Sequence, residues 1–181
     1  MKLQKNSIND VYSPAEDTYF IAENIEKESG HSALDVGSGS GLLTKQLEKS
    51  FDLVVGTDIN YTALKDQTTF RTKNLVCCSG ADALFIKFDL IVCNLPYLAT
   101  DSISDIATDG GQDGFEIPKI IFDSVIPSLN SKGKFIFVTS SLSDYQKLID
   151  YAQKLGLDVA ILAKKKLFFE ELILVSGKKL D

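Results

Sequence analysis

The 181-residue sequence has one histidine, no tryptophan, three cysteines and no long hydrophobic run. His31 stands between a glycine and a serine, so a histidine-dependent triad or a Cys/His zinc site would have to rest on one side chain. Cys77, Cys78 and Cys93 form neither an even set nor a C-x-x-C pair, which argues against a disulfide framework. We therefore expect no metal site and a reducing compartment.

No segment approaches the roughly 18 apolar residues that cross a bilayer, and the N-terminus lacks the apolar core of a secretion signal. We expect a cytoplasmic protein that does not enter membranes. With 19 basic and 25 acidic side chains, the net charge of −6 argues against an extended cationic surface for nucleic acid, although a local basic patch remains possible. The hydrophobic share of 44% predicts one packed domain over residues 1–181.

Short β-rich runs alternate with amphipathic stretches, which is typical of βαβ units around a parallel sheet. The last two runs are separated by too few residues for a helical crossover, so they predict an antiparallel hairpin at one end. The longest irregular segment spans residues 98–116. The expected strands are residues 32–36, 53–58, 74–78, 88–93, 134–140, 157–162 and 169–176, and the expected helices are 14–28, 42–49, 61–71, 118–129 and 143–155.

A glycine-rich turn follows the first expected strand of the sheet, where residues 34–41 read Leu-Asp-Val-Gly-Ser-Gly-Ser-Gly. Glycines permit a sharp turn and close approach of a ligand. Asp58 ends the next strand, where a carboxylate can accept both ribose hydroxyls. A dinucleotide fingerprint would place its third glycine at position 42, where Leu42 stands, so a NAD-dependent oxidoreductase is the weakest interpretation. An adenosine-containing cofactor is expected to contact Gly37, Ser38, Gly39, Gly41, Asp58 and Ile59.

A second motif, Asn94-Leu95-Pro96-Tyr97, leaves an apolar strand at the edge where open α/β sheets bind ligands. The Asn94 side-chain oxygen and the Leu95 carbonyl can both accept N–H bonds from one planar –NH2 group. Tyr97 offers a ring face and Pro96 stiffens the turn. The alternative is a capped strand exit without a catalytic role.

Asp82 follows the third expected strand, at the same edge of the sheet. Its carboxylate is placed to accept from an exocyclic amino group such as adenine N6, with Ala83 near the ring. As a lone residue, Asp82 would be an ordinary turn residue.

The N-terminal segment combines a helix start with two unexplained polar residues. Ser13 and Glu16 have the spacing of a capping box, and Pro14 suits the first helical position. Capping does not require Asp17 and Thr18, so we expect these two to touch a ligand.

Together these motifs resemble the class I S-adenosylmethionine-dependent methyltransferases, and within them the small HemK-related glutamine methyltransferases of archaea and eukaryotes that modify translation release factors. The resemblance implies a Rossmann-like fold with helices on both faces of a seven-stranded, mostly parallel sheet. It implies S-adenosyl-L-methionine as cofactor, S-adenosyl-L-homocysteine as product, and the glutamine amide of a Gly-Gly-Gln motif as acceptor. It also implies a small zinc-binding activator protein docked along an exposed strand edge. The matching segments are residues 11–18, 35–41, 57–60, 94–97, 110–114 and 169–172.

The resemblance also implies roles by position, with one departure at Leu95, where the family usually has a second proline. Because the group needed there is a carbonyl, leucine keeps the chemistry. The implied roles are Thr18, Asp35 and Gly37 near the methionine moiety, Asp58 at the ribose, Asp82 and Ala83 at the adenine, and Asn94 between cofactor and substrate.

Two other functions stay open at this stage. The first is an RNA or DNA adenine-N6 methyltransferase, which the Asn-Leu-Pro-Tyr sequence and the lysine run at 164–166 favour. The second is a non-catalytic cofactor-binding module. Gly110-Gly111-Gln112 spells the tripeptide that release factors present, but the Gly-Gly-x-x-Gly loop pattern of the family accounts for these glycines.

Overall fold

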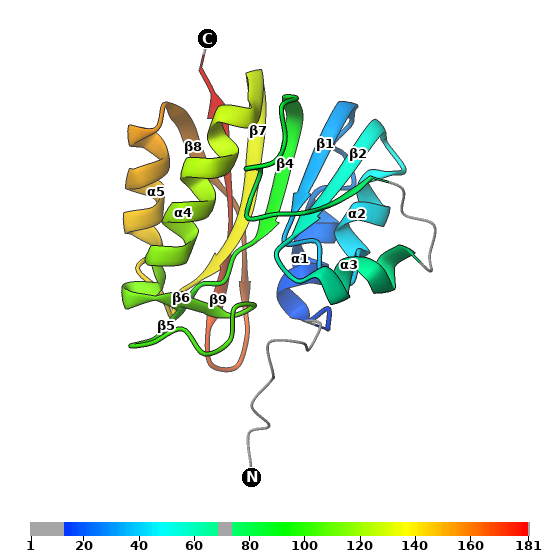
Figure 1. The fold of residues 1–181 in the computed structure, drawn as a ribbon. Helices are drawn as coiled ribbons and strands as arrows, with labels where there is room; N and C mark the ends of the chain where they lie inside the picture. The colour runs from blue at the N-terminus through cyan, green and yellow to red at the C-terminus, as the bar shows by residue number, and fades with distance from the viewer. Residues whose placement is uncertain (1–12, 69–73, 181) are drawn as a thin grey trace.

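The computed structural model describes residues 13–68 and 74–180, and seven of its strands form one sheet in the order β3-β2-β1-β4-β7-β9-β8 (Figure 1). The first five strands in this order are parallel, and β9 lies antiparallel between β7 and β8. The predicted mixed sheet with a C-terminal hairpin is therefore confirmed. The strands are β1 (Gly30–Val36), β2 (Phe51–Asp58), β3 (Leu75–Cys77), β4 (Phe88–Asn94), β7 (Leu129–Ser140), β8 (Leu157–Lys166) and β9 (Glu171–Lys179).

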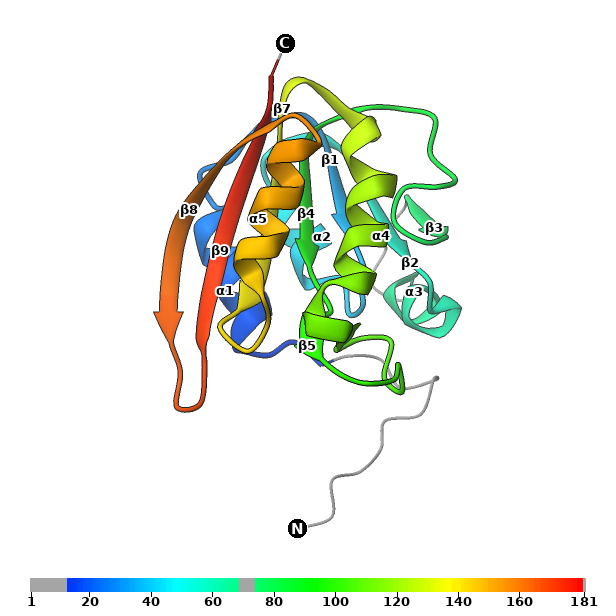
Figure 2. The same ribbon diagram turned by 90° about the vertical axis from the view of Figure 1, so that its left-hand side faces the viewer.

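Helices cover both faces of this sheet (Figures 1 and 2). Two apolar clusters lie on opposite faces: one includes residues of α1 (Glu16–Asn24) and α2 (Leu42–Leu47), the other residues of α4 (Glu116–Val125) and α5 (Tyr145–Lys154). The remaining helix, α3 (Tyr61–Thr68), packs beside β2 and β3. Strand β4 contributes to both clusters, as expected for a strand of a parallel sheet that is buried on both faces. The end of the expected helix 61–71 lies outside the described residues.

The start of α1 differs from the prediction. The helix begins at Glu16 and its N-cap residue is Ala15, with no side-chain capping bond. Ser13 therefore lies two residues before the N-cap, and Pro14 precedes the first helical position. The predicted capping box is wrong because the helix begins two residues later than its spacing requires. The Glu16 carboxylate forms an ion pair with Lys165 of β8 instead, at 2.6 Å. The first two residues of the motif at 11–18 lie outside the described residues.

Residues 98–116, expected to be irregular, contain β5 (Leu98–Ala99), β6 (Asp109–Gly111) and the short helix η1 (Gln112–Gly114). This segment packs on the turn after Asn94. A Cβ atom at Gly110 would lie 2.7 Å from the Pro96 carbonyl oxygen, and one at Gly114 would collide with the Tyr97 carbonyl. The glycines thus let two backbones approach closely, while Gln112 is exposed.

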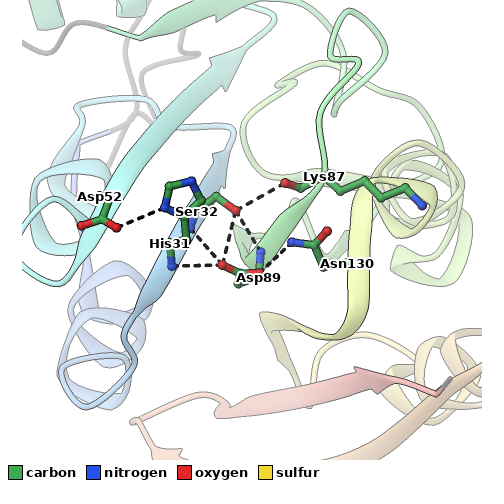
Figure 3. Close-up of polar contacts among 6 residues, drawn as sticks. All are labelled: His31, Ser32, Asp52, Lys87, Asp89 and Asn130. Atoms are coloured by element: carbon green, nitrogen blue, oxygen red, sulfur yellow. Dashed lines mark hydrogen bonds and ion pairs between the residues drawn. The ribbon is translucent and has the colours of Figure 1, made fainter.

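Hydrogen bonds satisfy the polar groups at the amino ends of β1 and β4 (Figure 3). Asp89 accepts the backbone N–H groups of His31 and Ser32 at 3.0 Å and the Asn130 amide at 2.6 Å. Although its partial burial acts in the opposite direction, these hydrogen bonds hold the pKa of Asp89 below its usual value. The single histidine contacts exposed Asp52 and no nucleophilic side chain in this network.

In the described ranges, no helix is long and apolar enough to span a membrane.

Candidate active site

A cavity of about 530 Å³ opens at the carboxyl ends of the parallel strands. Its walls come from the glycine turn after β1, the ends of β2 and β4, the turn after β3, the loop after β5, and α4. This is the edge where open α/β sheets bind ligands. Of the residues predicted from sequence, the cavity wall includes Thr18, Gly37, Ser38, Gly39, Asp58, Ile59, Asn94 and Pro96.

The glycine turn is joined directly to the acidic residue that ends β2. The Gly39 N–H donates to Asp58 Oδ2 at 2.8 Å, and the Asn60 N–H donates to Asp58 Oδ1 at 2.8 Å. Burial raises the pKa of Asp58, although these hydrogen bonds act in the opposite direction. Each carboxylate oxygen keeps a further lone pair, so Asp58 can still accept ribose hydroxyls.

Asp35 lies beneath this turn and is fully buried. The Thr44 hydroxyl donates to Asp35 Oδ2 at 2.6 Å, whereas Oδ1 has no partner. Burial raises the pKa of this carboxyl to about 7, the Thr44 hydrogen bonds oppose that rise, and the charge of Asp58 adds to it. Asp35 is not part of the cavity wall, so it is expected to act on a ligand through the field of its charge.

Asn94 and Thr18 meet across the cavity from strand β4 and helix α1. The Thr18 hydroxyl donates to Asp17 Oδ1 at 3.1 Å, so its oxygen is free to accept from Asn94 Nδ2 at 3.3 Å. This bond fixes the orientation of the Asn94 amide. Asn94 Oδ1 is buried without a partner, and it is therefore available to a ligand N–H.

The three residues after Asn94 are placed differently from one another. Pro96 lines the cavity, whereas the Leu95 and Tyr97 side chains are buried in the two core clusters. Burial, and then the charges of Asp17 and Glu170, raise the pKa of the Tyr97 phenol. The structure therefore does not bring the Tyr97 ring to the cavity wall, where the sequence placed it, because the ring packs beneath the site. Its contact with a ligand stays a prediction.

Asp82, Ala83 and Gly41 also lie outside the cavity wall. Asp82 and Ala83 are exposed, and Asp82 Oδ1 accepts from the Ser124 hydroxyl of α4 at 2.5 Å. The wall on this side is formed by the preceding Cys78, Ser79 and Gly80.

Gln67 of α3 is a site residue that the sequence interpretation missed. It is almost fully buried and donates from Nε2 to Ser38 Oγ at 2.9 Å and to the Gly39 carbonyl at 2.7 Å. A Cβ atom at Gly41, whose φ is +80°, would lie 2.7 Å from Gln67 Oε1. Gln67 thus supports the glycine turn from outside, and no local sequence signal distinguishes it from other helical glutamines.

Buried side-chain atoms without a hydrogen-bond partner gather at this edge. Among the described residues they belong to Asp35, Thr57, Gln67, Asn94 and Thr100, which lie at or near the carboxyl ends of the strands. Native proteins leave few such atoms, and of these five residues Asn94 alone lines the cavity, so its Oδ1 is the atom that a polar ligand there could satisfy. Within residues 13–68 and 74–180 no group of three or more His, Cys, Asp or Glu side chains could hold a metal ion.

Three features together define the class I methyltransferase fold: the strand order, the antiparallel hairpin, and the glycine turn that is hydrogen-bonded to Asp58. The chain belongs to the methyltransferase small-domain family, whose model matches residues 9–168, and within it to the HemK-related branch. This membership confirms the predicted fold class and enzyme class.

Two relatives and two solved structures illustrate the family. A Methanocaldococcus jannaschii chain named as a protein N5-glutamine methyltransferase is 34% identical over 94% of this chain and 93% of that one. Methyltransferase HEMK2 of Homo sapiens is 28% identical over 84% of this chain and 82% of its own. The E. cuniculi Mtq2-Trm112 complex, described as responsible for methylation of the eRF1 termination factor, has a TM-score of 0.81 at 28% identity and covers 93% of this chain and 98% of that chain. Bradyrhizobium japonicum NodS with S-adenosylhomocysteine, at 15% identity, has a TM-score of 0.67, covers 91% of this chain and 85% of that chain, and supports the fold alone.

Proposed function

We propose that this enzyme transfers a methyl group from S-adenosylmethionine to the side-chain amide nitrogen of glutamine in a Gly-Gly-Gln segment of a translation release factor. The observation that carries the proposal is Asn94 Oδ1, a buried acceptor without a partner, held by Thr18 at the wall of the cavity. The names of the M. jannaschii relative and of the Mtq2 complex support this acceptor.

The cavity fits an adenosine-containing methyl donor. Asp58 would bind the ribose, and Gly37 and Gly39 would contact the methionine moiety beside Thr18. The charge of Asp35 would act on the cationic part of the donor from below. At the adenine end we retain Asp82 and Ala83 as predicted contacts, and Ser79 and Gly80 of the cavity wall are additional candidates. Gly41 and Ile59 would complete the ribose side.

The chemistry requires orientation more than a base. An amide nitrogen is a poor nucleophile because its lone pair is delocalised into the carbonyl. Asn94 Oδ1 and the Leu95 carbonyl would accept both N–H groups of the substrate amide and aim its nitrogen at the methyl group, which the sulfonium of the donor supplies. Pro96 would keep this pair of acceptors in place. Orientation of this kind contributes up to roughly 7–11 kcal/mol, and no side chain needs to remove a proton before transfer. The amide nitrogen would release one proton to solvent as it gains the methyl group, and the donor would leave as S-adenosylhomocysteine.

We also propose a small activator protein as partner, a counterpart of Trm112 in the E. cuniculi complex. The sheet has two edge strands to which a protein could add, β3 and β8. That the partner binds zinc follows from the family resemblance alone. We further propose that the enzyme acts in the cytoplasm as a single domain over residues 1–181.

The alternative acceptor is an adenine amino group in RNA or DNA, which the Asn-Leu-Pro-Tyr sequence favours. The lysine run at 164–166 gives it little support, because Lys164 pairs with Glu171 at 2.9 Å and Lys165 pairs with Glu16 at 2.6 Å. These ion pairs neutralise most of the positive patch that would hold phosphates.

The test incubates the purified protein, alone and with its activator, with methyl-labelled S-adenosylmethionine and an extract of the source cell. We expect label that protease removes and nuclease does not, and label on purified release factor. A release factor whose motif reads Gly-Gly-Asn is the matched control and should take up none. Label removed only by nuclease would refute the glutamine assignment and support the adenine acceptor.

A further inference from the structure

The turn between β8 and β9 carries two adjacent phenylalanines on the surface. Phe168 is 92% exposed and Phe169 is 85% exposed, and their rings meet edge to face with centroids 4.6 Å apart. A monomer gains nothing in stability from such side chains in water, and large exposed apolar groups that lie together commonly mark binding sites. We call this pair the hairpin tip.

The hairpin tip is held in place by hydrogen bonds and ion pairs at its base. The Leu167 N–H donates to the Glu170 carbonyl at 2.8 Å and closes the turn. The Ser140 hydroxyl, at the end of β7, donates to the Glu170 carboxylate. On the other side, Lys165 pairs with Glu16 of α1 at 2.6 Å. The two rings therefore stand on an ordered support, which reduces the entropy that binding would cost.

The hairpin tip lies at the same edge of the sheet as Asn94. Strand β9 is antiparallel to β7 and β8, so the turn between β8 and β9 lies beside the carboxyl end of β7, where Ser140 pairs with Leu172. Asn94 pairs with Val138 at that end of the neighbouring strand β4. Both views show the turn at the end of the sheet that carries β5 and the start of α1 (Figures 1 and 2). The tip thus stands outside the cavity, on the acceptor side of the molecule.

We propose that Phe168 and Phe169 form a docking site for the body of the methyl-acceptor protein while its glutamine reaches Asn94. The inference rests on the proposed function. The partner that fits is a folded protein with an apolar depression close to its glutamine loop, because paired aromatic rings on a rigid turn bind by insertion into such a depression. A permanent subunit over the tip would crowd the edge from which the glutamine must enter, so the occupant is the transient substrate.

The docking site separates two substrates that share the same reactive group. A full-length release factor can contact both the cavity and the tip, whereas a short Gly-Gly-Gln peptide can contact only the cavity. For the double variant Phe168→Ala/Phe169→Ala, we expect the KM for release factor to rise about tenfold or more with kcat unchanged. We expect kcat/KM for the peptide to stay within about twofold of the unmodified enzyme, because the peptide does not reach the tip. For the release factor, loss of a contact made equally in the ground and transition states raises KM alone.

The control is Phe85→Ala, which removes an even more exposed phenylalanine, at 98%, from the segment between β3 and β4. It should leave the ratio of protein to peptide kcat/KM unchanged. Calorimetric titration of release factor with the unmodified enzyme and the double variant tests docking independently of turnover.

Four results would overturn the docking site. Two are kinetic: an unchanged KM and affinity for release factor in the double variant, or an equal loss of kcat/KM for peptide and protein. The other two would assign the tip to a different partner: a shift in oligomeric state on gel filtration would make it an interface between copies, and loss of activator binding would make it an activator site. If the unmodified enzyme methylates neither protein nor peptide, the proposed function fails first and the docking site fails with it. A failure confined to the double variant concerns the docking site alone.

Discussion

The amino and carboxyl ends of the parallel strands, here called the amino edge and the carboxyl edge of the sheet, differ in how their aspartates are hydrogen-bonded and in the direction of their pKa shifts. At the amino edge, Asp89 accepts two backbone N–H groups and the Asn130 amide, and its pKa is lowered. At the carboxyl edge, Asp35 is fully buried with one oxygen unpartnered, and its pKa is raised to about 7. The fold itself supplies the hydrogen bonds at the amino edge, whereas at the carboxyl edge Asn94 Oδ1 is left open at the cavity wall, where a ligand can donate to it.

This contrast separates structural from functional polar residues without any reference to relatives. A hydrogen-bonded carboxylate such as Asp89 stabilises the fold. Buried acceptors without partners, such as Asn94 Oδ1, lower stability and are retained where a ligand uses them. Paired substitutions of the same residue type at the two edges should therefore have opposite consequences for activity and stability.

The largest contrast is expected between the two asparagines. Asn94→Ala should lower kcat by about 10²-fold or more, since it removes one preorganised contact to the reacting amide, with little change in cofactor affinity. Asn130→Ala should leave kcat unchanged and lower the free energy of unfolding by about 1–3 kcal/mol, because the Asp89 carboxylate loses its shortest hydrogen bond. Steady-state kinetics and urea unfolding measure the two effects. Turnover of the Asn94 variant within a few-fold of the unmodified enzyme would remove Asn94 from its assigned role.

Two aspartates at opposite ends of β2, Asp52 and Asp58, provide the second contrast. Asp58→Ala should weaken binding of S-adenosylmethionine by about 1–3 kcal/mol, because a charged acceptor for the ribose hydroxyls is lost. Asp52→Ala, at the amino edge, should leave the affinity for S-adenosylmethionine unchanged, since this exposed carboxylate pairs with His31, far from the cavity. Isothermal calorimetry with both variants decides the matter, and equal affinities would place Asp58 outside the cofactor site.

The site residues that could be predicted from sequence are those whose position along the chain fixes their place in space. Asp58 and Asn94 end parallel strands, so their meeting at one edge follows from the fold class alone. Gln67 could not be found this way, because its contacts with the glycine turn depend on how α3 packs. The same limit explains Tyr97, whose ring turns into the core, and Glu16, whose ion pair with a distant strand replaces the expected cap.

Gln67 therefore offers a third test, on a residue that positions the turn. Gln67→Ala removes two donated hydrogen bonds, and we expect the KM for S-adenosylmethionine to rise about tenfold while kcat and the KM for the acceptor stay unchanged. Gln67→Glu should weaken binding most at high pH, where a carboxylate would face the Gly39 carbonyl, and should recover at low pH, where a protonated acid can donate. The matched control is Gln146→Ala on the exposed face of α5. A purely structural role would lower stability without this pH dependence.

The last contrast is in how stability depends on pH, and the sign of this dependence differs between the two edges. Because the pKa of Asp35 is raised to about 7 in the folded state, the folded protein binds more protons than the unfolded chain between about pH 4 and pH 7. Its contribution to stability is therefore full below the unfolded pKa and is lost as the pH rises to 7, by at most about 1.4 kcal/mol per pH unit. Asp89, with a lowered pKa, contributes stability above its unfolded pKa and loses it as the pH falls below about 4.

Urea unfolding across pH 3–8 of Asp35→Asn and Asp89→Asn can separate these contributions. Asp35→Asn should flatten the fall in stability between pH 4 and pH 7, and Asp89→Asn should flatten the loss below pH 4. Saturating S-adenosylmethionine should also reduce the slope that depends on Asp35, because a cationic ligand above the turn favours the ionised carboxyl. If the two variants changed the same part of the profile, the opposite pKa shifts assigned to Asp35 and Asp89 would not hold.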